Sequence, residues 1–532
     1  MTNHNNTYAY YDVLKPVTLC DLIRLGKENW KDKTAFYTEE DKTISYSEFS
    51  DMVSCLGTFI MSEGFTNAHI GILSENSVNW CLAFFGICNS GNVIVPLDKN
   101  ESDEEIQKLL RQSDCEALFY SDKFKKRIDK FDGVKCFSLE EINDYVDKGK
   151  QMIEDGEDVF EKADIDKDRL AAIVFTSGTM GDKKGVMLSH ENLVSDAYET
   201  CRYVKARDTQ ILLPLHHTFA WASGMFAMFF YGVSAHISGD LKRIVKDLNN
   251  NKPQNISAVP MMVEMIYKSI WNSAKKQNKE AKLKRLITFS NLLMSIGIDI
   301  RRKLFREIRD SFGGELQLII CGGAALDTDI EKGLFDLGFT VLNGYGITEC
   351  SPVVSVNRNR DFRFGSVGKP LCCNEVKIAD KNEKGVGEIL VSGSNVMKGY
   401  YKDTKATEEA FDGKWFKTGD YGYIDKDGYL FITGRKKNLI VLANGENVAA
   451  EEIEMKLMKL GYVKEVMVYE ENQKIVAEFY LDDKITKETL DKDIARYNDS
   501  VPQYKNISYI KIRDNPFEKT TTLKIKRVQH EH

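Results

Sequence analysis

Short apolar runs, each followed by a polar or glycine-bearing turn and then a helical stretch, recur along much of the chain. HIGIL (69–73) precedes SENS and a helical run from Ser77 to about Asn89, and Gly91 separates that run from the apolar segment VIVPL. A strand, a crossover helix and a second strand in this order predict a βαβ unit. AAIVF (171–175), LQLII (316–320) and FTVLN (339–343) are apolar throughout. Such runs indicate sheet covered on both faces, with ligand sites in the loops beyond the carboxyl ends of the strands.

The pattern changes after residue 343. GVGEILVSGSNVMKGYY and GYIDKDGYLFITG predict short strands with Gly and Asp-Gly turns. After GRKKN (434–438) the order becomes helix, strand, strand, helix, from EEIEMKLMKL, VKEVMVYE and KIVAEFYL onward. We therefore expect an α/β protein. Residues 1–434 would form a large multi-subdomain N-terminal part with parallel-rich βα sheets and a small β lobe, and residues 435–532 a small α+β C-terminal lid domain.

One uncharged stretch, residues 211–238, has the length of a membrane-spanning helix and includes WASGMFAMFFYGVSAHIS. Pro214, His216, His217 and Ser223 interrupt it. A chain of 532 residues also needs fully buried segments, so we expect this stretch to lie in the protein interior.

Composition excludes several classes of protein. Hydrophobic residues make up 42% and charged residues 29%, which is ordinary globular usage and excludes disorder. A net charge of −7 disfavours nucleic acid as a partner. The eleven cysteines lack zinc-site or disulfide-framework spacing, and the first fifteen residues lack the features of a secretory signal. We expect a reducing, cytoplasmic location.

The loop TSGTMGDKKG after strand 171–175 offers three glycines, three hydroxyls and two lysines. Backbone N–H groups, hydroxyls and ammonium groups together form a cradle for phosphate oxygens. It is not a Walker A motif, because Val186 follows Gly185 where that motif needs Lys and then Ser or Thr. Taken alone, the loop could also be a surface turn, the less favoured alternative.

Further motifs follow in a fixed order. GYGITE, after FTVLN, presents the ring of Tyr345 for stacking on a base, the hydroxyl of Thr348, and the carboxylate of Glu349, which suits Mg²⁺. FKTGDYG places Asp420 where a carboxylate can accept both hydroxyls of a ribose, and GRKKN supplies Arg435. Each residue alone would more often be a turn residue or a surface charge, but their order and spacing together are specific.

With these motifs the chain resembles the adenylate-forming superfamily, which contains acyl-CoA synthetases, adenylation domains of peptide synthetases and luciferases. The resemblance extends from TISYSEFS (43–50) to KTTTLKIKR (519–527). It implies two half-reactions: a carboxylate and Mg·ATP give an acyl-adenylate and pyrophosphate, and a thiol then displaces AMP to give a thioester. Because the first step brings two anions together, it depends on positioning and charge neutralisation.

The resemblance implies a role for each motif residue. The β- and γ-phosphates would contact Thr176, Ser177, Gly178, Thr179, Gly181 and Lys184. Adenine would contact Gly323, Ala324 and Tyr345, the ribose Asp420 and Arg435, the α-phosphate Thr348, and magnesium Glu349 and Thr179. Lys524, in LKIKR, matches the catalytic lysine; a lysine this close to a chain end would otherwise be interpreted as a solvated charge. Lys437 matches the hinge, at about residues 435–438, on which the lid would rotate.

The chain departs from the superfamily pattern at Met180, Lys183, Ala450 and Leu523, where Thr or Ser, Pro, Pro and Gly are usual. Met180 removes one donor from the phosphate cradle, and Leu523 leaves less room for close backbone approach. We expect slower adenylation rather than loss of function, since every charged position is intact.

The resemblance places residues 211–238 in the acyl pocket, with His217 and Gly322 as pocket residues. The stretch contains no acid to hold an α-amino group, which favours an uncharged acyl tail over an amino acid. SAVPMMVEMIY (257–267) and the helical insertion after it resemble long-chain fatty acyl-CoA synthetases. The predicted reaction is activation of a medium- to long-chain fatty acid to its CoA thioester.

Within the insertion, residues 268–306 contain eleven basic residues against two acidic ones, Glu280 and Asp299, a net charge of +9 around the apolar LITFSNLLMSIGI. One interpretation is peripheral contact with the anionic inner face of a membrane. The alternative is a solvated helix pair covering the core.

The chain ends five residues after Arg527, so we expect a diffusible thiol acceptor. CoA is favoured, and free acyl carrier protein is the alternative because both present the same thiol arm. Two further alternatives are a stand-alone adenylation enzyme for another apolar acid and a catalytically inactive, membrane-associated protein that retains the fold. The intact nucleotide motifs favour an active enzyme.

Overall fold

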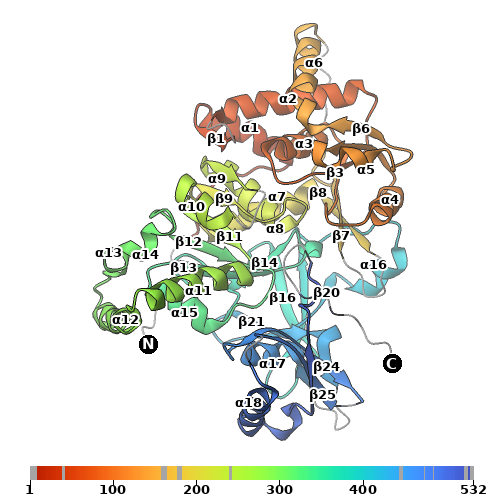
Figure 1. Ribbon diagram of the computed structural model, residues 1–532. Coiled ribbons are helices and arrows are strands. Elements are labelled where there is room, and N and C mark those ends of the chain that lie inside the picture. Colours follow the sequence, from red (N-terminus) through yellow and green to blue (C-terminus); the bar gives the residue numbers. More distant parts are fainter. Residues whose placement is uncertain are drawn as a thin grey trace. The chain divides into compact units, whose positions relative to one another are not determined.

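The structure is a computed structural model that describes residues 9–38, 42–156, 165–176, 183–238, 243–441, 447–472, 474–482, 485–520, 525 and 527. The chain forms two compact units (Figure 1). Unit 1 consists of Met1–Glu375 and Val391–Phe416, and unit 2 of Val376–Leu390 and Lys417–His532. The chain therefore leaves unit 1 after Glu375 and returns to it for one further segment.

Unit 1 contains a nine-stranded sheet with a parallel centre. Strands β1 and β9 to β13 pair in parallel, while β2, β14 and β15 join in antiparallel fashion. In spatial order the strands are β15 (Lys369–Pro370), β14 (Val353–Val356), β13 (Thr340–Gly346), β12 (Leu318–Cys321), β11 (Asn255–Ala258), β9 (Thr209–Ile211), β10 (Ala235–Ile237), β1 (Thr34–Tyr37) and β2 (Thr43–Ser45). The apolar runs LQLII and FTVLN form the neighbouring strands β12 and β13, as their sequences predict.

A seven-stranded sheet is the second layer of strands in unit 1. Its strands are β18 (Gly399–Tyr400), β8 (Lys184–Ser189), β7 (Leu170–Thr176), β4 (Val93–Pro96), β3 (His69–Leu73), β5 (Cys115–Tyr120) and β6 (Lys135–Ser138). β3 and β4 are parallel neighbours joined by α3 (Val78–Asn89), which confirms the predicted βαβ unit. The residues of α3 from Trp80 to Asn89 are all buried, because this helix is apolar around most of its circumference.

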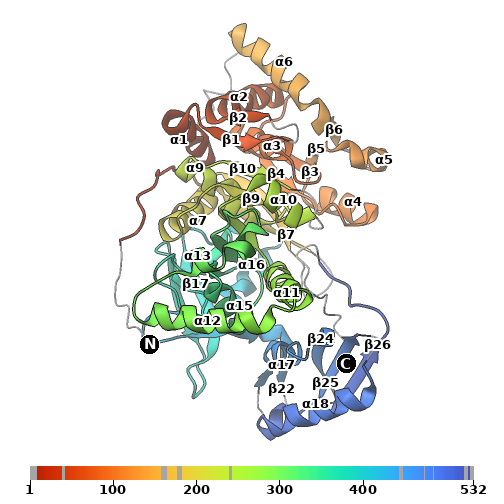
Figure 2. The same ribbon diagram turned by 60° about the vertical axis from the view of Figure 1, so that its left-hand side comes forward.

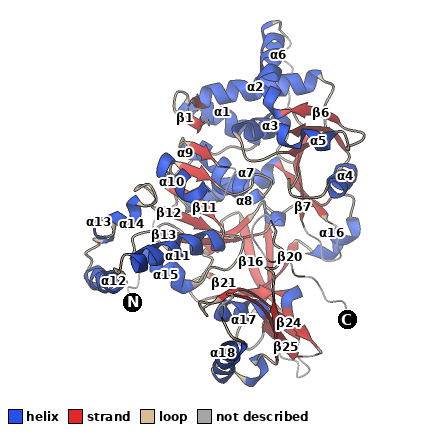
Figure 3. Cartoon of the chain, viewed as in Figure 1, coloured by secondary structure: helices blue, strands red, loops and turns tan. Residues whose placement is uncertain are grey.

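Helices flank both sheets of unit 1 (Figure 3). Several of them start at a Ser or Thr whose side chain caps the first turn, as in the reciprocal capping boxes of α1, α2 and α7. Besides α3, the helices are α1 (Leu19–Trp30), α2 (Tyr46–Ser62), α4 (Asp103–Gln112), α5 (Lys125–Ile128), α6 (Ile142–Glu154), α7 (His190–Tyr203), α8 (Thr218–Ala220), α9 (Ala227–Tyr231), α10 (Ile244–Asn251), α11 (Pro260–Lys276), α12 (Glu280–Ser295), α13 (Arg301–Leu304), α14 (Arg306–Asp310), α15 (Thr328–Asp336) and α16 (Thr404–Ala410).

The uncharged stretch 211–238 lies in the interior of unit 1. It forms α8, a π-helical turn at Trp221–Met225, α9 and β10. Trp221, Phe226 and Phe229 are at most 1% exposed and lie in one aromatic cluster with Phe84 and Phe85 of α3. Within the residues that the structure describes, no helix combines the length and apolar composition needed to cross a membrane. The interior location predicted for this stretch is confirmed.

Unit 2 begins with strands of a five-stranded sheet, of which β19 belongs to unit 1, and ends in an α+β fold. The sheet consists of β16 (Asn374–Ala379), β17 (Gly387–Gly393), β20 (Trp415–Ile424), β19 (Phe411–Asp412) and β21 (Leu430–Arg435). β22 (Leu439–Val441), β23 (Asn447–Ala449), α17 (Ala450–Leu457), β24 (Val463–Glu471), β25 (Lys474–Leu481), α18 (Lys487–Asp499) and β26 (Tyr509–Arg513) follow. α17, β24, β25 and α18 reproduce the predicted order of helix, strand, strand, helix around a shared apolar core.

The predicted α/β fold class is confirmed. The limits of the compact units differ from the sequence-based boundary at residue 435, which lies inside unit 2. The division into compact units describes how the chain packs and not where it rotates, so the hinge at residues 435–438 stays a prediction.

Candidate functional site

Thr348 and Glu349 occupy a tight turn between β13 and β14. They form a single 3₁₀ turn, Thr348–Cys350, closed by a hydrogen bond from the Ile347 N–H to the Pro352 carbonyl, 2.9 Å. A Cβ atom at Gly346 would overlap the Pro352 carbonyl, so this position requires glycine. The turn holds the carboxylate of Glu349 at the end of a central strand.

Tyr400 connects this turn to the strand that follows the predicted phosphate loop. Its hydroxyl donates a hydrogen bond to Oε1 of Glu349, 3.1 Å, and the Nζ atom of Lys184 lies 4.8 Å from the centre of its ring. Burial and the neighbouring Glu349 raise the pKa of Tyr400 well above its usual value, so the phenol remains a donor at neutral pH. The structure thus brings Lys184 and Glu349 together through Tyr400.

Tyr400 was not among the residues identified from sequence. It lies in NVMKGYY, where its aromatic ring was interpreted only as part of a strand. The pairing of β18 with β8 brings Tyr400 opposite Val186, and the Met397 N–H donates to the Glu349 carbonyl, 2.9 Å. The only signal in the sequence is a glycine, Gly399, followed directly by two tyrosines, Tyr400 and Tyr401.

Two buried polar side chains of helix α7 form hydrogen bonds with the chain segments next to Glu349 and Tyr400. The amide of Asn192 donates to the carbonyls of Ser394, 2.7 Å, and Val396, 3.0 Å. Oδ1 of Asp196 accepts hydrogen bonds from the Val353 N–H, 2.9 Å, and from the Asn395 amide, 3.1 Å. One helix therefore fixes the segments on either side of Glu349 and Tyr400.

The predicted phosphate loop begins at Thr176 and ends at Lys184, which are partners in the antiparallel pair β7 and β8. Ser177, Gly178, Thr179 and Gly181, together with the departure at Met180, lie outside the described residues. The described strands on either side of this segment, β7 and β8, are antiparallel neighbours.

Lys183, at a position where the superfamily usually has Pro, has carboxylate partners. Its Nζ atom lies 2.6 Å from Oε1 of Glu101 and 3.4 Å from Oε1 of Glu105, and its carbonyl accepts from the Gln112 amide, 3.0 Å. These contacts tie the end of the loop to α4 and its preceding segment. Lys183 is therefore directed to the α4 side, whereas Lys184 is directed to Tyr400.

The predicted adenine residues lie at the ends of two neighbouring strands. β12 and β13 are parallel and in register from Leu318 and Thr340 to Cys321 and Asn343. Gly323 and Ala324 follow β12 and are exposed, and Gly323 has a φ of +88°, which favours glycine. Tyr345 lies two residues beyond Asn343 on β13, just as Gly323 lies two residues beyond Cys321. These three residues therefore lie together at the carboxyl ends of neighbouring strands.

Of the predicted pocket residues, Gly322 lies against the ring of Phe219, and His217 lies beside His216. A Cβ atom at Gly322 would be 3.1 Å from the Phe219 ring, so glycine leaves space for that ring. The rings of His216 and His217 have centroids 4.3 Å apart. Burial, together with Lys99 and Lys183, lowers the pKa of His216 to about 3. His216 is therefore neutral, and its Nε2, 3.6 Å from Oδ2 of Asp98, does not form an ion pair.

The predicted ribose residues are cross-strand partners within unit 2. Asp420 of β20 pairs with Arg435 of β21, and Nε of Arg435 donates to Oδ1 of Asp420, 2.9 Å. Asp420 is 3% exposed, so its carboxylate is fixed in direction. Lys437 lies in the following 3₁₀ turn, Lys436–Asn438, where burial and then Arg435 lower its pKa. Lys524, the predicted catalytic lysine, lies outside the described residues.

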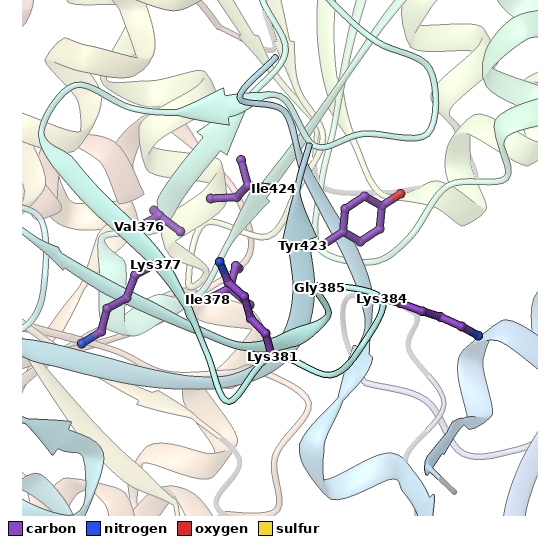
Figure 4. Close-up of a pocket in the computed structure, with 8 residues that line it drawn as sticks. All are labelled: Val376, Lys377, Ile378, Lys381, Lys384, Gly385, Tyr423 and Ile424. Carbon is purple, nitrogen blue, oxygen red and sulfur yellow. The ribbon is translucent and has the colours of Figure 1, made fainter. Parts of the chain in front are cut away.

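A pocket of about 360 Å³ in unit 2 contains none of these residues (Figure 4). It is lined by Val376, Lys377, Ile378, Lys381, Lys384, Gly385, Tyr423 and Ile424. The side chains of Lys377 and Lys384 point in opposite directions (Figure 4), so this hollow does not gather its cations around one point.

The fold and the sequence together define an adenylate-forming enzyme of the AMP-forming acid–CoA ligase class. The chain belongs to the AMP-binding enzyme family, whose model matches residues 25–401. Long-chain-fatty-acid–CoA ligase FadD15 of Mycobacterium tuberculosis is 31% identical over 428 residues, 75% of this chain and 70% of its own. Long-chain-fatty-acid–CoA ligase 1 of Homo sapiens is 30% identical over 482 residues, 81% of this chain and 68% of its own.

Solved structures share the fold. O-succinylbenzoate coenzyme A synthetase from Bacillus subtilis, in complex with ATP and magnesium ion, superposes with a TM-score of 0.75 at 21% identity, covering 95% of this chain and 98% of that one. ATP-bound MatB from Rhodopseudomonas palustris gives a TM-score of 0.77 at 22% identity, with 96% and 97% coverage. Both comparisons confirm the architecture of a large N-terminal part and a small C-terminal α+β part.

Proposed function

We propose that this enzyme activates a medium- to long-chain fatty acid with Mg·ATP and transfers the acyl group to CoA. The main support is the arrangement of Lys184, Tyr400 and Glu349, which joins the end of a predicted phosphate loop to a predicted magnesium ligand. The curated relatives at about 30% identity are long-chain-fatty-acid–CoA ligases. The buried, uncharged stretch 211–238 offers an apolar environment beside His217.

In the first half-reaction a carboxylate oxygen of the acid bonds to the α-phosphorus of ATP, and the bond from that phosphorus to the bridging oxygen breaks to release pyrophosphate. The charge on the phosphates must be neutralised. We assign this role to Lys184, to the backbone of residues 177–181, and to Lys524. Glu349 would bind the magnesium that arrives with ATP, because Mg²⁺ takes one or two carboxylates in addition to phosphate oxygens.

Tyr400 would orient Glu349, since its hydroxyl donates to Oε1 of that carboxylate. Thr348 would contact the α-phosphate, and the Asp420 carboxylate, oriented by Arg435, would accept the ribose hydroxyls. In the second half-reaction the thiol sulfur bonds to the acyl carbon and AMP leaves. Rotation at Lys437 would replace the Lys524 face of the lid with a face that admits the thiol.

A pyrophosphate-release screen tests the proposal directly. Purified enzyme receives ATP, magnesium and saturated acids of graded length from acetate to stearate, with an amino acid panel as a control. Each acid is tested with CoA and with holo acyl carrier protein. We expect release to require an apolar chain of medium or greater length, and AMP and acyl-CoA to form in equal amounts. Preference for an amino acid, or thioester formation only on carrier protein, would contradict the proposal.

A further inference from the structure

Helix α12 presents a row of large apolar side chains to solvent. Phe289 is 51%, Leu292 66% and Ile296, the C-cap residue, 68% exposed, and their spacing of three and four residues places them on one side of the helix. Ile298, just beyond the helix, is 48% exposed. The opposite side, with the buried Leu283 and Ser290, packs toward α11 and α15. Contiguous exposed apolar groups of this size usually mark a contact surface.

Basic residues surround this apolar row. Lys276, Lys279, Lys282 and Arg285 are exposed at the end of α11 and along the first half of α12, and Arg302 and Lys303 are exposed beyond it. The two acids of residues 268–306 already have partners: Glu280 pairs with Lys284, 2.7 Å, and Asp299 with Arg301, 2.6 Å. In the described part of the chain, those six basic residues make no ion pair. Their charge is therefore available to a partner.

We propose that the α12 face, defined as Lys276, Lys279, Lys282, Arg285, Phe289, Leu292, Ile296 and Ile298, docks on an anionic phospholipid bilayer. A leaflet consists of a headgroup layer with phosphates above a layer of acyl chains. The acyl chains would accept the side chains of Phe289 and Leu292, and the phosphates would pair with the lysines. α12 lies at the outer edge of unit 1 in both views (Figures 1 and 2), so the face is accessible within that unit.

The composition of the α12 face favours a bilayer over two other partners, a second copy of this chain and a polyanion. Two copies of this face would repel one another, because each belongs to a segment of net charge +9. A polyanion without an apolar layer would leave Phe289, Leu292 and Ile296 in water. The whole chain has a net charge of −7, opposite in sign to this segment, and that asymmetry would orient the protein on the membrane.

Vesicle flotation of the full-length protein tests the proposal. The vesicles contain either phosphatidylcholine alone or a mixture with phosphatidylglycerol, at low and high salt. We expect binding to the mixed vesicles only, and weaker binding at high salt. A charge variant (Lys276→Gln, Lys279→Gln, Lys282→Gln, Arg285→Gln) should bind roughly 1,000-fold more weakly. An apolar variant (Phe289→Ser, Leu292→Ser, Ile296→Ser) should also lose binding, although its charge is unchanged.

A matched control removes four exposed cations elsewhere on unit 1: Lys125→Gln, Lys126→Gln, Lys150→Gln and Lys205→Gln. This control should bind as the parent does. All variants change exposed side chains, and circular dichroism and thermal midpoints should match the parent. Binding that the control variant loses equally, or that neither α12 variant alters, would overturn the proposal. So would a parent protein that ignores the mixed vesicles and instead forms oligomers that the α12 variants abolish. Because the readout is flotation, the result does not depend on which acid the enzyme uses.

Discussion

Replacement of the buried Asp196 on α7 tests how the site loops are held. Its Oδ1 atom accepts from the Val353 N–H and the Asn395 amide, while Oδ2 is buried without a hydrogen-bond partner among the described residues. Burial raises the pKa of Asp196 well above its usual value, although the two donors oppose this shift. We infer a neutral carboxyl group. Asp196→Asn should then preserve both hydrogen bonds, since an amide carbonyl replaces Oδ1 and the NH₂ group replaces the protonated Oδ2.

Asp196→Ala has a different outcome. It leaves two buried donors, the Val353 N–H and the Asn395 amide, without an acceptor. Each unsatisfied donor costs about 1–3 kcal/mol, so the loss is about 2–6 kcal/mol before any cavity cost. A single buried hydrogen-bond acceptor therefore supports a large share of the local stability.

The pH dependence follows from the direction of the pKa shift. A carboxyl group with a raised pKa in the folded state contributes its stability below its unfolded pKa of about 3.9 and loses it as pH rises toward the folded pKa. Over that window the parent should lose up to about 1.4 kcal/mol per pH unit relative to Asp196→Asn, which does not titrate. The stability of Asp196→Asn relative to the parent should therefore increase as pH rises.

Two measurements check this. Urea midpoints are recorded between about pH 4 and about pH 7, and hydrogen exchange is followed in peptides that cover residues 349–356 and 393–400. Asp196→Ala should accelerate exchange in both peptides and Asp196→Asn in neither. If the Asn variant were as damaging as the Ala variant at every pH, Asp196 would be ionised in the folded protein and the reasoning would be wrong.

Three predictions concern the chemistry of the site. Tyr400→Phe removes the hydroxyl that donates to Glu349 but keeps the ring beside Lys184, so ATP–pyrophosphate exchange should slow by about 10- to 100-fold. An unchanged rate would exclude an orienting role. Asp420→Ala removes a buried carboxylate beside Arg435 and should raise the KM for ATP by about 10-fold or more; an unaltered KM would place the ribose elsewhere. Lys524→Ala should abolish adenylate formation, measured as pyrophosphate release, and leave thioester formation from supplied acyl-adenylate largely intact. Equal loss in the two assays would contradict the division of labour between the half-reactions.

The strands of unit 1 were predictable from sequence because parallel strands covered on both faces are continuously apolar. HIGIL coincides with β3, and AAIVF lies within β7. The turn residues after β12 and β13 were predictable for the same reason, since they follow the strands directly.

The residues that hold the loops were not predictable. α7 contains Asn192 and Asp196 in a helix buried on several sides, where polar residues would ordinarily indicate a solvent face. Their partners at Val353 and Asn395 are distant in sequence, and Lys183 likewise pairs with Glu101 from an earlier element. Local spacing contains no information about pairings between elements so far apart.

The return of the chain to unit 1 has a consequence for protein synthesis. β18, which contains Tyr400, pairs with the edge of β8, yet the ribosome makes it long after β8. Until then β8 exposes an unpaired strand edge, which can pair with other chains. A fragment that ends at Glu375 would keep that exposed edge and lack the phenol that meets Glu349. Truncated forms of this enzyme for expression should therefore retain Val391–Phe416, and aggregation during translation should decrease once this segment has emerged.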